Sequence, residues 1–298
     1  MNTLTKRSVL NAGISTGPAA AFVDAILQLG AARTSAYVCC ANAHMLVEAH
    51  RQPDFGQILA RAAIVTPDGS PVAAALGWLH GQAQPRLAGM DLLPTLLVEA
   101  ARRGQSVYFY GTTPDVLAAM LLRIKHELPT LRVAGVCAPP FRPLTAAEDA
   151  AEVTAINAAD PDLLFVALGC PRQERWMAAH RGRIRACMLG VGQAFRVYAG
   201  LEPRLPLWAR QLWLEWAFRL WQEPRRLASR YFVTNTWFIL LLMRQLLMCK
   251  VLRVHAALRP AVAPPRRRRL AWAAAGNAVA HTTRQLLRTK SRMILAGG

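Results

Sequence analysis

The chain has 298 residues, of which 53% are hydrophobic, and it carries a formal net charge of +19. This length and apolar content suffice for the core of one large domain, and they exclude an intrinsically disordered chain. Of the net charge, 15 positive charges lie beyond Glu223, the last acidic residue, which leaves +4 for the first 223 residues. A polycationic end of this kind seeks an anionic surface, either phospholipid or nucleic acid.

The six cysteines do not point to a zinc site or a disulfide framework. Cys39 and Cys40 are adjacent, and the sequence contains no Cys-x-x-Cys pair. Free thiols in a cytoplasmic protein are therefore the favoured interpretation. The N-terminus also lacks the long apolar run of a signal peptide, because Asp24 and the polar stretch 12–17 interrupt it.

Short apolar runs alternate with amphipathic stretches over the first two hundred residues. Strands are predicted at 37–40, 63–66, 106–110, 132–136, 163–168 and 186–191. Helices are predicted at 19–30, 42–51, 71–80, 91–103, 114–127, 145–158 and 171–181. Apolar strands that alternate with helices predict an α/β fold, with a Rossmann-like, mostly parallel sheet covered by helices on both faces. We expect this catalytic domain to span residues 1–202.

The character of the chain changes near residue 203, where a stretch rich in Trp and Arg begins. The apolar segment 231–247 is interrupted by Asn235 and Arg244, whereas a membrane span needs about 20 apolar residues. A helix at the membrane surface is predicted rather than a span; a helical packing arm within an oligomer is the alternative. The sequence thus predicts a helical, membrane-binding appendage at 203–250 and a basic, flexible tail at 251–298.

Ligands of such sheets bind beyond the carboxyl ends of the strands, so the polar residues that follow each strand are the candidates for a site. Asp68 lies in Thr-Pro-Asp-Gly-Ser-Pro, directly after the second predicted strand. Its carboxylate could take a proton from an attacking hydroxyl group. From spacing alone, an ordinary turn aspartate that caps its own backbone is the favoured interpretation.

The other candidates have similar alternatives. Asn42 could orient a ligand hydroxyl or cap the helix that follows it. The guanidinium of Arg86 suits a diphosphate but could equally lie on the surface, and Asp91 is predicted to be a helix N-cap. Gln173 and Glu174 are polar residues in the first turn of a helix, where capping is the alternative to ligand binding. Composition and spacing alone thus indicate an α/β enzyme or binding domain.

Taken together, motifs between about residues 37 and 231 resemble the WecG/TagA/CpsF family of glycosyltransferases (glycosyltransferase family 26). The blocks occur in order and include Ala-Asn-Ala-His-Met, Pro-Asp-Gly-Ser-Pro, Arg-Leu-Ala-Gly-Met-Asp-Leu, Gly-Cys-Pro-Arg-Gln-Glu-Arg-Trp-Met, Leu-Gly-Val-Gly-Gln-Ala-Phe and Leu-Glu-Trp-Ala-Phe-Arg-Leu-Trp-Gln-Glu-Pro-Arg-Arg-Leu. The Ala-Pro-Pro-Phe and Gly-Cys-Pro blocks are most similar to members from exopolysaccharide clusters.

The resemblance implies an inverting, metal-independent transfer from a UDP-sugar to a sugar on a polyprenyl diphosphate carrier, without a cofactor. It implies that Asp68 is the general base. The residues that it implies for substrate binding are Cys40, Asn42, Arg86, Gln173, Glu174, Arg219 and Arg226. The last two would reach the phosphates from the C-terminal arm, which would rest on an anionic membrane surface. The expected location is cytoplasmic, peripheral on the inner face of the bacterial plasma membrane; a homo-oligomer is left open.

Two departures from the family pattern bear on activity and sugar preference. Cys40 stands where the family usually has Thr, and Arg196 stands where it normally has Asp. They motivate an alternative, a non-catalytic member that acts as a membrane-associated assembly partner. A nucleic-acid-binding protein is the remote alternative, because it would need aromatic and basic residues in an ordered groove, whereas here the aromatic residues cluster beside an apolar helix.

Overall fold

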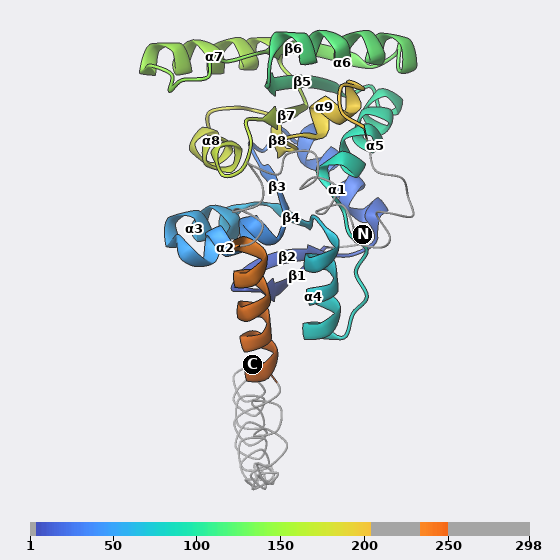
Figure 1. Cartoon of the computed structure of the whole chain (residues 1–298). Helices are drawn as coiled ribbons and strands as arrows, with labels where there is room; N and C mark the ends of the chain where they lie inside the picture. The colour runs from blue at the N-terminus through green and yellow to red at the C-terminus, as the bar shows by residue number, and fades with distance from the viewer. Residues whose placement is uncertain (1–3, 204–232, 250–298) are drawn as a thin grey trace, which may run out of the picture. The chain divides into compact units, whose positions relative to one another are not determined.

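The computed structural model describes residues 4–203 and 233–249 (Figure 1). Arg219 and Arg226, most of the Trp- and Arg-rich stretch and the basic tail therefore lie outside the described residues.

The centre of the molecule is a parallel sheet of six strands in the order β4-β3-β8-β7-β5-β6. The strands are β3 (Tyr37–Ala41), β4 (Ile64–Pro67), β5 (Ser106–Gly111), β6 (Arg132–Cys137), β7 (Leu163–Ala167) and β8 (Cys187–Gly190). All six were predicted from the sequence, and the predicted α/β fold is confirmed. They were recognisable because most of their residues are buried and apolar, as expected of a sheet covered on both faces.

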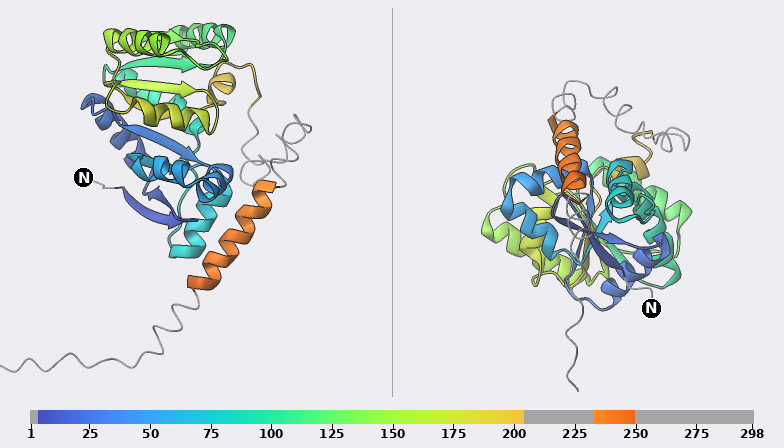
Figure 2. Two further views of the ribbon diagram at one scale, coloured as in Figure 1. Left: turned by 90° about the vertical axis from the view of Figure 1, so that its left-hand side faces the viewer. Right: turned by 90° about the horizontal axis from the view of Figure 1, so that it is seen from below.

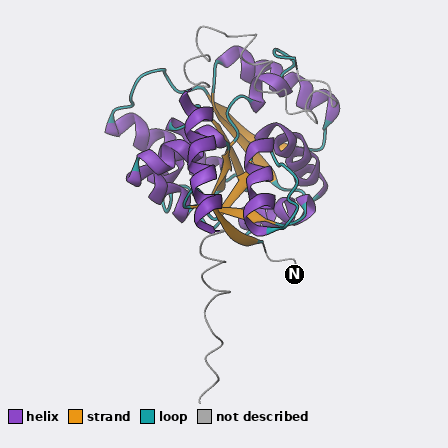
Figure 3. Ribbon diagram, turned by 60° about the horizontal axis from the view of Figure 1, so that its bottom comes forward, coloured by secondary structure: helices purple, strands orange, loops and turns teal. Residues whose placement is uncertain are grey.

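Helices cover both faces of this sheet (Figure 3). They are α1 (Ala19–Ala31), α2 (Ala43–Arg51), α3 (Pro53–Arg61), α4 (Ser70–His80), α5 (Gly89–Arg102), α6 (Pro114–Glu127), α7 (Ala146–Ala159), α8 (Arg172–His180) and α9 (Ala194–Tyr198). Alternate strand residues point to opposite faces. Val38 of β3 belongs to the apolar cluster that includes residues of α1, α5, α6 and α9, whereas Cys39 belongs to the cluster that includes residues of α2, α3, α4 and α8.

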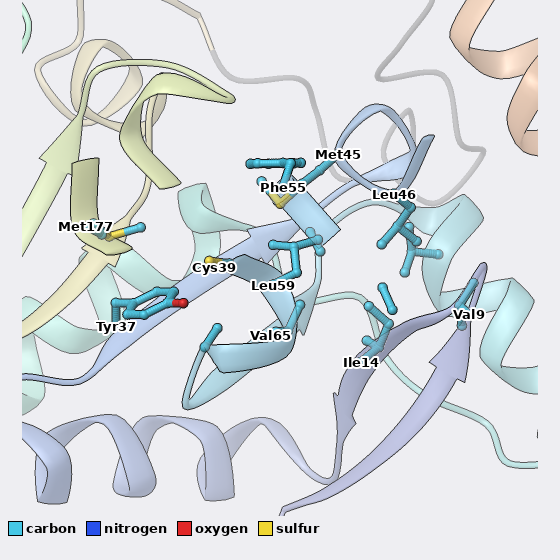
Figure 4. Close-up of a cluster of buried hydrophobic side chains, with 14 of the residues drawn as sticks. Val9, Ile14, Tyr37, Cys39, Met45, Leu46, Phe55, Leu59, Val65 and Met177 are labelled. Carbon is cyan, nitrogen blue, oxygen red and sulfur yellow. The ribbon is translucent and has the colours of Figure 1, made fainter. Parts of the chain in front are cut away.

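The second of these clusters also includes an N-terminal hairpin of β1 (Thr5–Val9) and β2 (Ala12–Thr16). Figure 4 shows Val9 and Ile14 of the hairpin in one apolar cluster with Leu46 of α2. The hairpin borders β4, where the backbone N–H of Val65 donates to Ser15 Oγ at 3.1 Å. It was not predicted, because four of the five residues of β1 are exposed and give no apolar pattern.

Two short helices were also missed, and each has a local reason. Helix α3 follows α2 almost without a loop: Gln52 ends one helix and is the N-cap of the next. Pro53 then starts α3, at a position where a backbone N–H would have no acceptor within the helix, so the missing N–H of proline costs no hydrogen bond. Helix α9 has only five residues, too few for a helical periodicity to show.

A further helix, at residues 233–249, lies beside the hairpin (orange in Figures 1 and 2). Phe238 and Leu242 lie in the same apolar cluster as the hairpin. Gln245 bridges the two elements: its Oε1 accepts from the backbone N–H of Leu10 at 2.9 Å, and its Nε2 donates to the carbonyl of Ser8 at 3.4 Å. Among the described residues, no helix is both long and apolar enough to cross a membrane.

Candidate functional site

The loops after β3, β4, β7 and β8 start at the carboxyl ends of four adjacent strands, since these strands are consecutive in the sheet. This is the edge at which open α/β sheets bind their ligands. The fold therefore brings polar residues that follow these strands, Asn42, Asp68, Gln173 and Gln193, to one rim. The sequence-based prediction that these residues share a rim rested on this rule alone. The observed strand order adds that the four strands are neighbours in the sheet.

Asn42 follows β3 and is the N-cap of α2. Its Oδ1 accepts from the backbone N–H of Met45 at 3.0 Å. The capping interpretation is thus correct for this oxygen. The amide nitrogen of Asn42 is the group that remains for a ligand.

Asp68 follows β4 in a tight turn, and its backbone N–H lies 3.0 Å from the carbonyl oxygens of both Ala41 and Thr66. The next residue, Gly69, is the N-cap of α4 and has a φ of 92°, a conformation that favours glycine. Its helix receives no side-chain hydrogen bond at the cap and has no acidic residue in its first turn. The N-cap of α4 is thus Gly69, which follows Asp68, whereas Asn42 is itself the N-cap of α2.

Arg86 is brought to the same corner by backbone pairing beside the end of β4. The backbone N–H of Leu87 donates to the carbonyl of Pro67 at 2.8 Å, and Thr66 Oγ1 donates to the carbonyl of Leu87 at 2.9 Å. Arg86 then forms an ion pair with Asp91, with Nη2 3.3 Å from Oδ2. With 18% of its side chain exposed, Arg86 is not an ordinary surface arginine.

The prediction that Asp91 is an N-cap is wrong. Helix α5 begins at Gly89 with Ala88 as its N-cap, so Asp91 lies inside the first turn. The helix starts two residues earlier than predicted, where Gly89 packs closely against the residue after β8: a Cβ on Gly89 would lie 3.2 Å from both Cα and the carbonyl oxygen of Val191. Asp91 instead pairs with Arg86.

Cys40 lies in β3 opposite Thr66 of β4 and is buried. Burial raises the pKa of its thiol, and the negative charge of Asp68 raises it further. The thiol is thus a neutral neighbour of the Asp68 carboxylate. Because the side chain is buried, Cys40 can contribute to substrate binding only through its backbone atoms and through its effect on the shape of the site.

Gln173 and Glu174 lie on the opposite side of the rim, in the first turn of α8, with 5% and 0% of their surface exposed. Gln173 Nε2 donates to Glu174 Oε1 at 2.7 Å. The N-cap of this helix is Pro171, which makes no side-chain hydrogen bond. Burial raises the pKa of Glu174 to about 7, against the opposing effect of hydrogen bonds with Gln173 and with its own backbone. Among the described residues, Gln173 Oε1 and Glu174 Oε2 are buried without a hydrogen-bond partner.

Two comparisons with known proteins bear on this rim. The model of the glycosyl transferase WecG/TagA/CpsF family matches residues 7–251. The chain belongs to this family. Its relatives include proteins named N-acetylglucosaminyldiphosphoundecaprenol N-acetyl-beta-D-mannosaminyltransferase.

The relative from Bacillus spizizenii W23 is 33% identical over 193 residues, which cover 64% of this chain and 73% of the relative. The relative from Bacillus subtilis 168 is 29% identical over 195 residues, covering 65% and 74%. The relative from Staphylococcus aureus NCTC 8325 is 27% identical over 197 residues, covering 65% and 76%. The chain is therefore a glycosyltransferase, and the resemblance inferred from its motifs is confirmed.

One further network of this glycosyltransferase was not predicted. Gln193, after β8, donates from Nε2 to Glu202 Oε2 at 2.6 Å, and the second carboxylate oxygen of Glu202 pairs with Arg196. The sequence marked Arg196 as unusual, but its partner six residues later gave no pattern. Within the described ranges, no three side chains among His, Cys, Asp and Glu form a group that could hold a metal ion.

Proposed function

We propose that this glycosyltransferase moves a sugar from a UDP-sugar to a polyprenyl-diphosphate-linked saccharide, with inversion and without a metal, in the synthesis of an exopolysaccharide. The relatives' names describe the transfer of N-acetylmannosamine to N-acetylglucosaminyldiphosphoundecaprenol, and the first part of the proposal extends this type of acceptor to the present chain. The exopolysaccharide assignment is supported by the Ala-Pro-Pro-Phe and Gly-Cys-Pro blocks.

The placement of Asp68 at the rim, directly after β4 and one residue before the N-cap of α4, is the observation that carries the proposal. In the proposed step, Asp68 takes the proton of the acceptor hydroxyl while that oxygen bonds to the anomeric carbon. The bond from the anomeric carbon to the β-phosphate oxygen breaks, and its electron pair leaves with UDP. Attack from the face opposite the leaving group inverts the anomeric centre.

The leaving diphosphate needs positive charge, because its β-phosphate gains a negative charge as the bond breaks. Arg86 stands at the same corner as Asp68 through the pairing of Leu87 with Pro67. Its planar guanidinium can bind two phosphate oxygens at once. Arg219 and Arg226, outside the described residues, are proposed to add charge from the appendage at 203–250, and the nitrogen of Asn42 to bind a sugar hydroxyl.

The test measures UDP release from a panel of UDP-sugars that starts with UDP-N-acetylmannosamine, with and without a polyprenyl-diphosphate-linked N-acetylglucosamine, in the presence of a chelator. Asp68→Asn should lower kcat by about 10²- to 10⁴-fold, the usual contribution of a general base. Asp115→Asn is the matched control, since Asp115 is an exposed carboxylate in the first turn after β5. It should leave kcat unchanged.

Acceptor-dependent release that survives chelation and depends on Asp68 supports the proposal. If wild type binds UDP but no donor gives acceptor-dependent release, the chain is instead a non-catalytic assembly partner, and Arg196 is the first residue to revert to Asp. A product with retained anomeric configuration contradicts the inverting step. Surface polysaccharide from a strain that lacks the protein tests the exopolysaccharide assignment.

The same proposal places the enzyme on the inner face of the plasma membrane as a peripheral protein. The helix at 233–249 exposes an apolar side: Leu240 is 59% exposed and Leu247 is 63% exposed, beside Trp237 and Met243. An apolar helix side followed by a basic segment supplies the two signals that stable membrane binding requires. This supports the division into a catalytic domain (1–202), an appendage (203–250) and a basic tail (251–298).

Vesicle sedimentation of the full chain tests this location. Binding to vesicles with anionic lipid should exceed binding to neutral vesicles, and it should fall in Leu240→Ser/Leu247→Ser. Leu122 of α6 is 72% exposed, so Leu122→Ser controls for the loss of an exposed leucine elsewhere. If the double variant binds vesicles like wild type, the exposed side belongs to an interface with another protein chain, such as a homo-oligomer.

A further inference from the structure

The orientation of the Gln173 amide is fixed by its surroundings. A Cβ on Gly190, inside β8, would lie 3.0 Å from Gln173 Nε2, whereas a Cβ on Gly192, in the loop beyond β8, would lie 3.4 Å from Gln173 Oε1. The nitrogen therefore points toward the sheet and the oxygen toward the loop at the rim. The hydrogen bond from Nε2 to Glu174 Oε1, at 2.7 Å, holds the amide in this orientation.

This arrangement leaves one unused acceptor. Gln173 Oε1 is buried and has no hydrogen-bond partner, and a buried polar atom without a partner is unfavourable unless a ligand completes it. An amide oxygen only accepts hydrogen bonds. A ligand group that completes this atom must therefore be a donor, either a hydroxyl or an N–H.

Within the described ranges, Glu174 forms no ion pair with a cation. Besides Gln173 and its own backbone, the groups that act on Glu174 or respond to its charge are thiols: Cys39 and Cys40 of β3, and Cys170 just before α8. Lys6 of β1 acts on Cys39, and Asp68 acts on Cys40. A fully buried carboxyl group without a paired cation is expensive for stability, so its retention points to a task other than holding the fold together.

We propose that Glu174 is a positioning residue, which holds Gln173 Nε2 so that Gln173 Oε1 faces the rim and selects a hydrogen-bond donor on the bound UDP-sugar. The inference rests on the proposed function, because it concerns the substrate of the same site. It assigns Glu174 an indirect role: Glu174 acts through Gln173, and the substrate contacts Gln173. The selected donor belongs either to the nucleotide or to the sugar.

The experiment compares Gln173→Leu, Glu174→Leu and Glu174→Gln. Calorimetry gives the Kd of UDP, and initial rates give KM and kcat for the UDP-sugar. Glu174→Leu should raise the KM about 10-fold with a smaller change in kcat, since an interaction of the bound substrate is lost. Glu174→Gln keeps an amide oxygen for Gln173 Nε2, so it should stay within about 3-fold of wild type.

A double variant separates positioning from other roles. If Glu174 acts through Gln173, then Gln173→Leu/Glu174→Leu should be no worse than Gln173→Leu alone. Additive losses overturn the proposal, as does a Glu174→Gln variant as impaired as Glu174→Leu. Glu48→Leu is the matched control, because Glu48 accepts from Gln52 Nε2 at 2.6 Å near the end of α2 remote from the rim.

The two binding measurements identify the donor. If Gln173→Leu and Glu174→Leu weaken UDP itself, the donor lies on the nucleotide. If the Kd of UDP is unchanged and only the KM of the UDP-sugar rises, the donor lies on the sugar. If both variants retain wild-type Kd and KM, the proposal is wrong. Because these variants are judged by UDP binding as well as by turnover, failure of the proposed transfer reaction is distinguishable from failure of this inference.

Discussion

The two sides of the rim differ in how their polar groups are held. On the side of β3 and β4, Asp68 and Arg86 are charged groups only partly buried, and Arg86 has Asp91 as a partner. On the side of β7 and β8, Gln173 and Glu174 are almost fully buried, and each has an oxygen without a hydrogen-bond partner. One side therefore offers charge close to solvent, and the other offers a neutral amide in a low-dielectric environment.

This difference suits two different tasks. A general base must exchange its proton with water, and an arginine must bind and release a charged product, so both benefit from partial exposure. A buried acceptor discriminates more strongly between ligands. A ligand without a matching donor leaves the acceptor without a hydrogen bond in a low-dielectric environment, where the loss is costly. We interpret the β3–β4 side as the reactive side and the β7–β8 side as the recognition side.

On the recognition side, the largest expected effect comes from filling the space that Gln173 occupies. In Gly190→Ala, the new Cβ would lie 2.8 Å from Met177 Cε and 3.0 Å from Gln173 Nε2. Overpacking of this kind typically destabilises by about 1–3 kcal/mol, and here it would also displace the amide. We expect a lower melting temperature and at least a 10-fold rise in the KM of the donor.

The control is Gly77→Ala, in α4. A Cβ on Gly77 has no neighbour closer than 3.9 Å, and replacing Gly by Ala in a helix stabilises by about 0.5–1 kcal/mol. If Gly190→Ala binds the donor like wild type, the recognition side does not depend on the placement of Gln173.

The burial of Glu174 predicts a pH-dependent stability that originates on the recognition side. Its pKa in the folded protein is about 7 against an ordinary 4.5, so the protonated form favours folding. This stabilisation is complete below about pH 4.5 and is lost as the pH rises through 7. Between pH 5 and 8, wild type should therefore lose about 2–3 kcal/mol relative to Glu174→Gln.

Urea unfolding of both proteins at several pH values measures this difference. If the free energies of unfolding of wild type and Glu174→Gln change in parallel with pH, Glu174 is ionised at the same pH in the folded and unfolded protein, and its environment is more polar than the structure indicates.

The sequence predicted the strands and the polar residues at their ends better than the partners of these residues. A run such as 163–167 is apolar throughout and could be recognised alone, and the carboxyl-end rule then pointed to Asp68 and Gln173. The pair of Arg86 and Asp91 could not be predicted, because it depends on where α5 starts. At that start, Gly89 packs against Val191, which is about a hundred positions away in the sequence.

The interpretation of individual polar residues shows the same limit. Asn42 and Asp68 each follow a strand and precede a helix, so their local patterns are alike. Only the structure distinguishes them: Asn42 caps its helix, whereas Gly69, not Asp68, is the cap residue of α4. Neighbouring residue types do not determine which atom a side chain uses once the turn has formed.

Asn42 gives a smaller, separable effect on the reactive side. Asn42→Ala should destabilise the protein by about 1 kcal/mol, because the first turn of α2 loses its cap. Asn42→Ser keeps an oxygen for the backbone N–H of Met45 and should retain most of this stability. If the amide nitrogen also binds substrate, Asn42→Ser should still raise the donor KM several-fold. Equal KM values in wild type and Asn42→Ser would restrict Asn42 to capping.

The smallest expected effect concerns the half-buried pair of Gln193 and Glu202 at the start of α9. Glu202 holds Gln193 there much as Glu174 holds Gln173, but it also pairs with Arg196, whose side chain is 44% exposed. Exposed ion pairs contribute little, so Arg196→Ala should change the free energy of unfolding by less than about 0.5 kcal/mol and the donor KM by less than about 3-fold. Urea unfolding and initial rates across the panel of UDP-sugars measure both. If Arg196→Ala changes the KM more than 10-fold for one UDP-sugar only, Arg196 belongs to the recognition side. A half-exposed arginine would then select the donor sugar as strongly as the buried amide of Gln173 does.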